Sequence, residues 1–308
     1  MSPEFAVAVV FAVVMSATPI LIAALGELVV EKSGVLNLGV EGMMLIGAVT
    51  GFIVTVSTGS PWLGALAALV CGAAVSLIFG YLTLSLTANQ VATGLALTIF
   101  GTGVSALLGA SFVGMTTSTL GAVFPRALSA DPIWRVLFGY SPLVYFSFFL
   151  TFAVWYFLKH TRGGLILRAV GENDASAHSI GYPVLRVRYL AVLFGGAMAG
   201  LAGSFYSLVL TPMWAERLTS GRGWIAIALV VFAAWRPGRL LVGAYLFGAV
   251  ITLELQAKAA GWSGLAPEFL TSLPYLMTIL VLALISGRKL SARTAAPACL
   301  GKPFRATA

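Results

Sequence analysis

Apolar stretches close to the length of a membrane-spanning helix recur along the whole chain. About 20 apolar residues in a helix cross a hydrocarbon core roughly 30 Å thick. Stretches that reach or approach this length lie at residues 5–25, 42–58, 62–86, 91–112, 141–158, 189–211, 223–235, 240–257 and 269–286. We therefore predict an all-α, polytopic membrane protein with about nine transmembrane helices.

The charge content of the chain supports the same class of protein. Hydrophobic residues make up 59% of the 308 residues and charged residues only 9%, whereas soluble domains carry roughly a quarter charged residues. Most of the surface must therefore face lipid. A net charge of +8 also occurs in nucleic-acid-binding proteins, but here the basic residues lie in short connections, where they set orientation. We expect membrane lipid around the chain and no nucleic-acid partner.

The distribution of Lys and Arg predicts the direction of the spans. With the N-terminus outside, 13 of the 18 basic residues lie on the inner side and five on the outer side, as the positive-inside rule requires. The stretch at 223–235 is short, because its residues rise only about 20 Å as a helix. It either crosses fully or re-enters on the same side. The charge balance favours a full crossing, which leaves the C-terminus in the cytoplasm.

The longest inner connection, residues 159–188, contains signals for a short helix. Asn173 is a good helix N-cap, Gly181 is suited to the position after a helix, and Pro183 prevents its continuation. These signals predict a single short helix at 174–180. A helix this short is not stable alone, so it is either part of a solvated loop or a docking element for a cytoplasmic partner.

Polar residues interrupt the apolar pattern in two places. Residues 26–44 carry several charges and glycines between the first two stretches. They form either a cavity floor or gate or a second helix that Asn37 caps, with Glu31 and Lys32 at the wetted interface. Polar groups also precede the fourth stretch, where they either bond between helices or line a pathway. The candidate pathway residues from both places are Asn37, Glu41, Asn89, Gln90 and Thr93.

Sequence patterns for catalysis and metal binding are absent. The chain has no GxxxxGK[ST] phosphate loop, no HExxH and no catalytic Ser/His/Asp order. His160 and His178 are isolated, and Cys71 and Cys299 fit no disulfide or metal motif. We expect no catalytic residue, metal or cofactor, and hence a transport subunit rather than an enzyme.

Small residues recur at a spacing of four in several apolar stretches, for example at Gly47 and Gly51 and at Gly196 and Gly200. Such pairs let the backbones of membrane helices approach closely. We expect tight packing within this chain, and a contact with another subunit is the alternative.

Five segments, taken together and in order, resemble the permease subunits of nucleoside-type ATP-binding-cassette (ABC) importers. The wider group includes ribose and branched-chain amino-acid permeases. The segments are GELVVEKSGVLNLGVEGMMLIGA at 26–48, ANQVATGLALTIFGTGVSALLG at 88–109, RAVGENDASAHSIG at 168–181, the two runs within 221–248, and PYLMTILVLALISGR at 274–288. The resemblance covers about nine-tenths of the chain. Asp174 departs from the family pattern, which often has proline there, and Ala233-Ala234 replaces a stretch that contains glycine.

The resemblance implies a bundle like that of type II ABC importers, in the inner membrane of a bacterium. It implies three partners: a cytoplasmic ABC ATPase that hydrolyses ATP, a second permease of homologous but different sequence, and an extracytoplasmic solute-binding lipoprotein. The transported solute would be a nucleoside or a simple sugar, moved by alternating access. A branched-chain amino acid or ribose is the alternative solute, and an ion-coupled secondary transporter is a further alternative.

The resemblance also divides the chain and assigns its coupling residues. Residues 1–287 would form the transmembrane permease domain, with 159–188 as its coupling loop, and 288–308 a basic cytoplasmic tail that we expect to be disordered. The residues that would dock on the ATPase are Arg168, Gly171, Glu172, Asn173, Ala177 and Gly181.

Overall fold

The computed structural model describes residues 3–125, 131–259 and 296–305, together with short stretches between 269 and 283. Within these residues the regular secondary structure is helical apart from two isolated β-bridges. The α-helices are α1 (Pro3–Lys32), α2 (Val40–Thr58), α3 (Pro61–Gly80), α4 (Gln90–Gly109), α5 (Pro132–Phe138), α6 (Pro142–His160), α7 (Arg162–Glu172), α8 (Asp174–Ser179), α9 (Val184–Phe205), α10 (Arg222–Phe232) and α11 (Pro237–Ala259). Single π-helical turns, η1 (Tyr81–Ser85) and η4 (Tyr206–Leu210), extend α3 and α9, and a 3-10 turn, η2 (Ala110–Phe112), follows α4.

The described residues include seven helices that are long and apolar enough to cross a membrane: α1, α2, α3, α4, α6, α9 and α11. The chain is therefore a multi-pass protein, but the expected count of about nine spans is not confirmed. The stretch at 223–235 forms the shorter helix α10, of 11 residues. Most of the last stretch, 269–286, lies outside the described residues.

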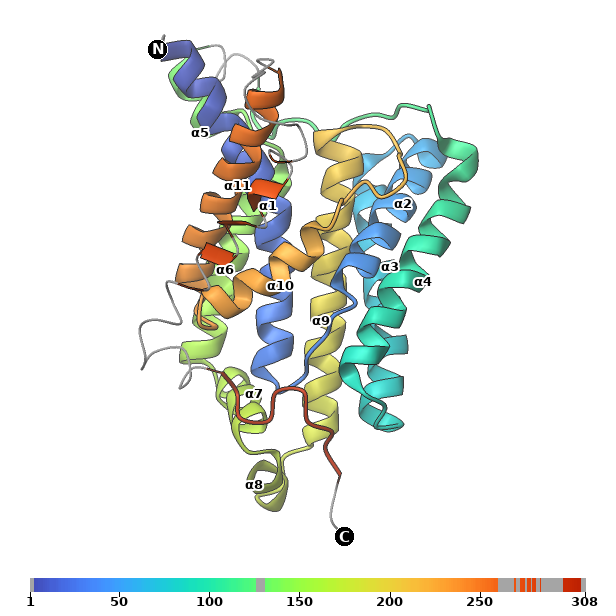
Figure 1. Cartoon of the computed structure of the whole chain (residues 1–308), viewed down its shortest axis with the longest axis vertical. Helices are drawn as coiled ribbons and strands as arrows, with labels where there is room; N and C mark the ends of the chain where they lie inside the picture. Colours follow the sequence, from blue (N-terminus) through green and yellow to red (C-terminus); the bar gives the residue numbers. More distant parts are fainter. Residues whose placement is uncertain are drawn as a thin grey trace.

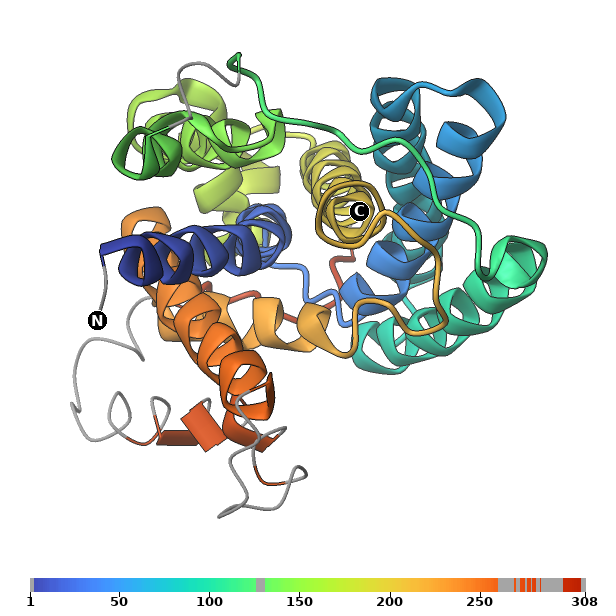
Figure 2. The ribbon, with the colours of Figure 1, turned by 90° about the horizontal axis from the view of Figure 1, so that it is seen from above.

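Helix α9 lies at the centre of the bundle, with α1, α2 and α3 packed around it (Figure 2). Helix α4 packs on the outer side of α2, and α6 and α11 pack on α1. Figure 1 shows the N-terminus at one end of the bundle, and α7, α8 and the C-terminal segment at the other. The connection between α6 and α9 and the end of the chain therefore lie on the same side.

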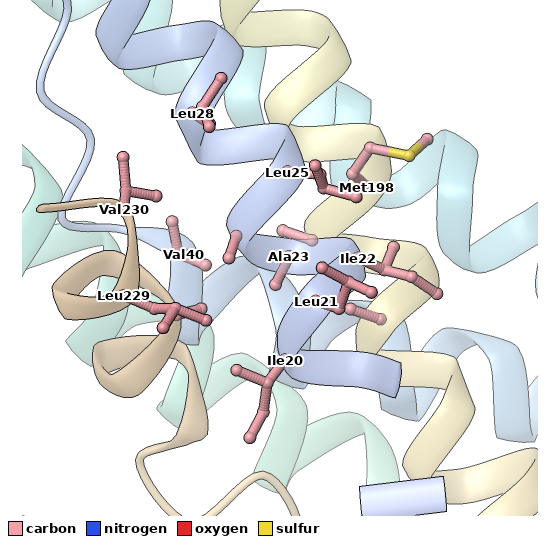
Figure 3. Close-up of a cluster of buried hydrophobic side chains, with 14 of the residues drawn as sticks. Ile20, Leu21, Ile22, Ala23, Leu25, Leu28, Val40, Met198, Leu229 and Val230 are labelled. Carbon is pink, nitrogen blue, oxygen red and sulfur yellow. The ribbon is translucent and has the colours of Figure 1, made fainter. Parts of the chain in front are cut away.

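Helices α2 and α10 do not run the full height of the bundle (Figure 1). After α1 ends, the chain rises through the connection 33–39 before α2 begins near mid-height, and α10 lies obliquely across the same level (Figure 1). Figure 3 shows the apolar core at this level, where Leu229 and Val230 of α10 lie beside Val40 of α2 and the side chains of α1. The core thus places the start of α2 against α10.

Close packing of α2, α3 and α9 depends on small residues. A Cβ atom added to Gly47 of α2 would collide with the carbonyl of Gly200 on α9, and one added to Gly200 would collide with the carbonyl of Ala68 on α3. The small residues at spacing four therefore bring helices of this chain together, as expected. The glycines allow the backbones of α2, α3 and α9 to come into direct contact.

Candidate translocation and coupling sites

The N-terminus of α10 is held by Glu41, in the first turn of α2. One carboxylate oxygen accepts hydrogen bonds from the Gly221 amide, at 2.8 Å, and from the Thr219 hydroxyl. The other accepts from the Gly223 amide at 2.6 Å. The first amides of a helix have no partner within the helix and carry partial positive charge. The buried carboxylate therefore satisfies donors that would otherwise face a membrane interior.

The C-terminal end of α10 is held by a second carboxylate, from α1. The Glu31 carboxylate accepts a 2.6 Å hydrogen bond from the indole nitrogen of Trp235, and both side chains are buried. Ala234 and Trp235 both have positive φ angles, 49° and 54°, which cost residues other than glycine roughly 1 kcal/mol or more. A short helix, followed closely by two strained residues, is thus fixed at each end by a glutamate of another helix.

The connection that precedes α2 is shaped by side chains as well. The Glu27 carboxylate of α1 accepts from the Asn37 amide at 3.1 Å, and the Asn37 side chain accepts from the Gly39 amide at 2.9 Å. Gly39, rather than Asn37, occupies the N-cap position of α2. Because Glu31 is fully buried, the alternative of an Asn37-capped helix with a wetted Glu31 is wrong.

A cavity of about 620 Å³ adjoins the N-terminus of α10. It lies between the first turns of α2, the middle of α4 and the chain that leads into α10. Its lining combines one carboxylate, one guanidinium, three hydroxyls and an indole. The residues that supply them are Glu41, Arg217, Thr98, Thr102, Ser220 and Trp224.

The structure separates the five candidate pathway residues. Glu41 lines this cavity, whereas Asn37, Asn89, Gln90 and Thr93 are not among its lining residues. The Asn89 side chain accepts from the Ala92 amide at 3.0 Å and so caps α4, and the Gln90 side chain accepts from the Leu36 amide at 2.8 Å. The Asn89 side chain thus stabilises the start of its own helix, and the Gln90 side chain holds the connection that precedes α2.

Sequence reasoning missed most of the cavity lining. Thr102, Arg217, Ser220 and Trp224 were not selected because they come from distant parts of the chain, the fourth apolar stretch and the region around residue 220, and none stands out in its own part. A usable signal was the cluster of polar residues immediately before the short stretch at 223–235, since a broken or short membrane helix commonly lines a cavity.

The predicted short helix is present at the end of the bundle opposite the N-terminus (Figure 1). Helix α8 begins after Asn173, whose side chain accepts from the Ser176 amide at 2.9 Å, and Gly181 follows it with φ +93°. The prediction of a single helix is wrong, because α7 precedes α8. Thr161 caps α7 by accepting from the Gly164 amide at 3.0 Å. The connection between α6 and α9 is therefore a pair of helices.

The six predicted coupling residues differ in exposure. Gly171 and Ala177 are buried, and Ala177 packs with Val170 and Val184 to anchor α8 on α7 and α9. The other four predicted residues, Arg168, Glu172, Asn173 and Gly181, are exposed. Ile180, which was not predicted, is 70% exposed at the end of α8.

Comparison with known proteins gives a consistent result. The family model described as "Branched-chain amino acid transport system / permease component" matches residues 9–282. The chain is 41% identical to a putative glucose ABC transporter permease protein of Haloferax volcanii, over 96% of this chain and 97% of the relative. It is 31% identical to a guanosine ABC transporter permease protein of Bacillus subtilis, over 96% of each chain. It is 28% identical to a nucleoside ABC transporter permease protein of Lactococcus lactis, over 89% of this chain and 90% of the relative.

Proposed function

Because this chain belongs to the branched-chain amino acid transport system / permease component family, we propose that it is the permease subunit of an ATP-driven importer for nucleosides or simple sugars. The relatives named as glucose, guanosine and nucleoside permeases cover nearly the whole chain. Residues 1–287 form the permease domain in this proposal. ATP hydrolysis belongs to a separate ATPase, since the chain has no phosphate-loop sequence.

The observation that carries the proposal is the capped, exposed helix α8 at the end of the bundle where the basic connection lies. In this proposal α8 and the exposed residues beside it, Glu172 and Ile180, dock on the cytoplasmic ATPase. The N-terminus then lies outside and the C-terminus in the cytoplasm. The excess of basic residues on the inner side supports this orientation.

The cavity beside α10 supports a neutral, hydroxylated solute. Glu41 and Arg217 carry opposite charges, so the lining has little net charge, and Glu41 already accepts three hydrogen bonds. The hydroxyls of Thr98, Thr102 and Ser220 offer both donors and acceptors. The indole of Trp224 offers a flat face on which a sugar ring or a nucleobase can stack.

The proposed mechanism is alternating access around this cavity, shared with a second permease of homologous but different sequence. Helix α4 presents an apolar face on which Ile99 is 75% exposed and Leu107 is 77% exposed, and this face supports a contact with lipid or with the second permease. An extracytoplasmic solute-binding lipoprotein delivers the solute. ATP binding changes the relative stability of the two states because the nucleotide has different affinities for them.

The test replaces residues 172–177 with a Gly/Ser linker in the complex of this chain, the second permease and the ATPase. We expect the ATPase to be lost from the purified complex while the permease stays folded. A milder variant, Ile180→Ser, should weaken the association. Its control is Val242→Ser, since Val242 is also 70% exposed but belongs to α11, a helix that lies apart from α8 (Figure 1). Undiminished co-purification of the ATPase with the linker variant would contradict the proposal.

A further inference from the structure

The C-terminal segment, residues 296–305, lies across the inner end of the bundle, below α7 and the connection between α1 and α2 (Figure 1). Its backbone bonds to both. The Cys299 amide donates to the Gly171 carbonyl at 2.9 Å, and the Gly301 amide donates to the Gly34 carbonyl at 3.1 Å. Disorder was expected for the whole tail, but these residues are fixed against the bundle.

The buried side chain of Arg188, at the start of α9, also contacts the C-terminal segment and the connection between α1 and α2. Its guanidinium is fully buried and forms an ion pair with Asp174 of α8 at 3.0 Å. It also donates to the Ser33 carbonyl at 3.2 Å and to the Lys302 carbonyl at 3.4 Å. A buried guanidinium is costly unless its charge is paired and its donors are satisfied. This contact therefore depends on α8, the α1–α2 connection and the C-terminal segment all being in place.

Phe304 and Gly34 make further contacts between the C-terminal segment, α8 and the α1–α2 connection. The ring of Phe304 lies 5.4 Å from that of His178 on α8 and 6.0 Å from the guanidinium of Arg188. Gly34 has φ +88°, and a Cβ atom there would lie 3.0 Å from the Arg188 guanidinium and 3.3 Å from the Cys299 Cβ. The segments are in direct contact, with no room for a side chain between them.

We propose that residues 296–305 form a strap that, with Arg188 as its positioning residue, joins α8 to the α1–α2 connection. Displacement of α8 then moves Ser33 and Gly34 together with the strap. The connection leads within a few residues to Asn37 and Glu41, and Glu41 holds the N-terminus of α10. The strap thus links the ATPase-facing helix to the cavity. Helix α8, with six residues, is too short to be stable without such tertiary contacts.

This inference rests on the proposed function, and its test uses the assembled transporter in liposomes. The chain is shortened to residues 1–295, and both ATPase co-purification and solute transported per ATP hydrolysed are measured. We expect the ATPase to co-purify fully while the transport ratio falls about tenfold, which is the size of a typical coupling between two sites. An unchanged ratio would overturn the proposal. So would loss of the ATPase, because the segment would then be a docking surface and not an internal strap.

A second pair of variants tests the strap without deleting it. Arg188→Lys removes the fork of donors that reaches three acceptors at once, because a lysine ammonium is a compact point charge. Its control is Arg186→Lys, two residues earlier on the same helix, where the side chain is exposed. Only the Arg188 variant should lose coupling, and equal coupling in both would overturn the proposal. If the unaltered chain binds no ATPase, the proposed function fails, independently of the strap.

Discussion

Replacement of Glu41 by glutamine tests whether this carboxylate holds α10 in place. Glutamine has nearly the same shape but offers one acceptor oxygen where the carboxylate offers two. The carboxylate accepts from the amides of Gly221 and Gly223 and from the Thr219 hydroxyl. In the Glu41→Gln variant the two amides cannot both keep an acceptor in the same geometry, because the side-chain NH₂ group faces one of them.

The expected loss follows from these three bonds. A hydrogen bond to a charged group contributes about 1.5–3 kcal/mol and a neutral one about 0.5–1.5 kcal/mol, while an unsatisfied buried donor costs about 1–3 kcal/mol. Burying a neutral amide costs less than burying a carboxylate, which offsets part of the loss. We expect a net loss of about 2–4 kcal/mol in the free energy of unfolding.

The assay is thermal unfolding of the purified chain in detergent, where this loss corresponds to a fall in Tm of about 5 °C or more. The matched control is Glu254→Gln on α11. Glu254 forms an i,i+4 ion pair with Lys258 at 2.7 Å, and such pairs contribute about 0.3–0.5 kcal/mol. Its Tm should therefore change little. If the two variants unfold at the same temperature as the unaltered chain, Glu41 does not hold α10 as inferred.

Two further predictions concern helix α8 and the central packing. Asn173→Ala removes the cap of α8, which contributes about 1 kcal/mol, and should weaken ATPase binding several-fold in a pull-down. Asn173→Asp keeps a capping oxygen and should preserve binding. Equal binding by both variants would count against a docking role for the capped helix. Gly200→Ala places a methyl group against the Ala68 carbonyl and should cost about 1–3 kcal/mol in a thermal unfolding assay. Gly103→Ala, whose added Cβ meets nothing within 4 Å, is its control, and a similar Tm for both would refute the close-packing argument.

The membrane class and most of the spans could be predicted from the sequence because their cause is local. A lipid-facing helix needs an unbroken apolar run of sufficient length, and that run is visible in the chain itself. The helix at α8 was predicted for a similar reason, since Asn173 and Gly181 act on backbone groups within a few residues of themselves. Helix α7 was missed because its residues, rich in glycine and arginine at the start, resemble a loop. Its apolar side becomes meaningful only when packed against α6.

The sequence by itself determined that the charges within residues 26–44, Glu31 and Glu41 among them, needed explanation, because charged groups near membrane depth require partners. It could not determine which partners they have. The Glu41 acceptor and the Gly221 donor are 180 residues apart in the chain, and Glu31 and Trp235 are 204 apart. Only the tertiary structure decided these pairings, because the packing of α10 against α1 and α2 brings one particular set of donors to each buried charge. The tertiary structure also decided that residues 296–305, which contain no apolar span, lie against α7 and α8.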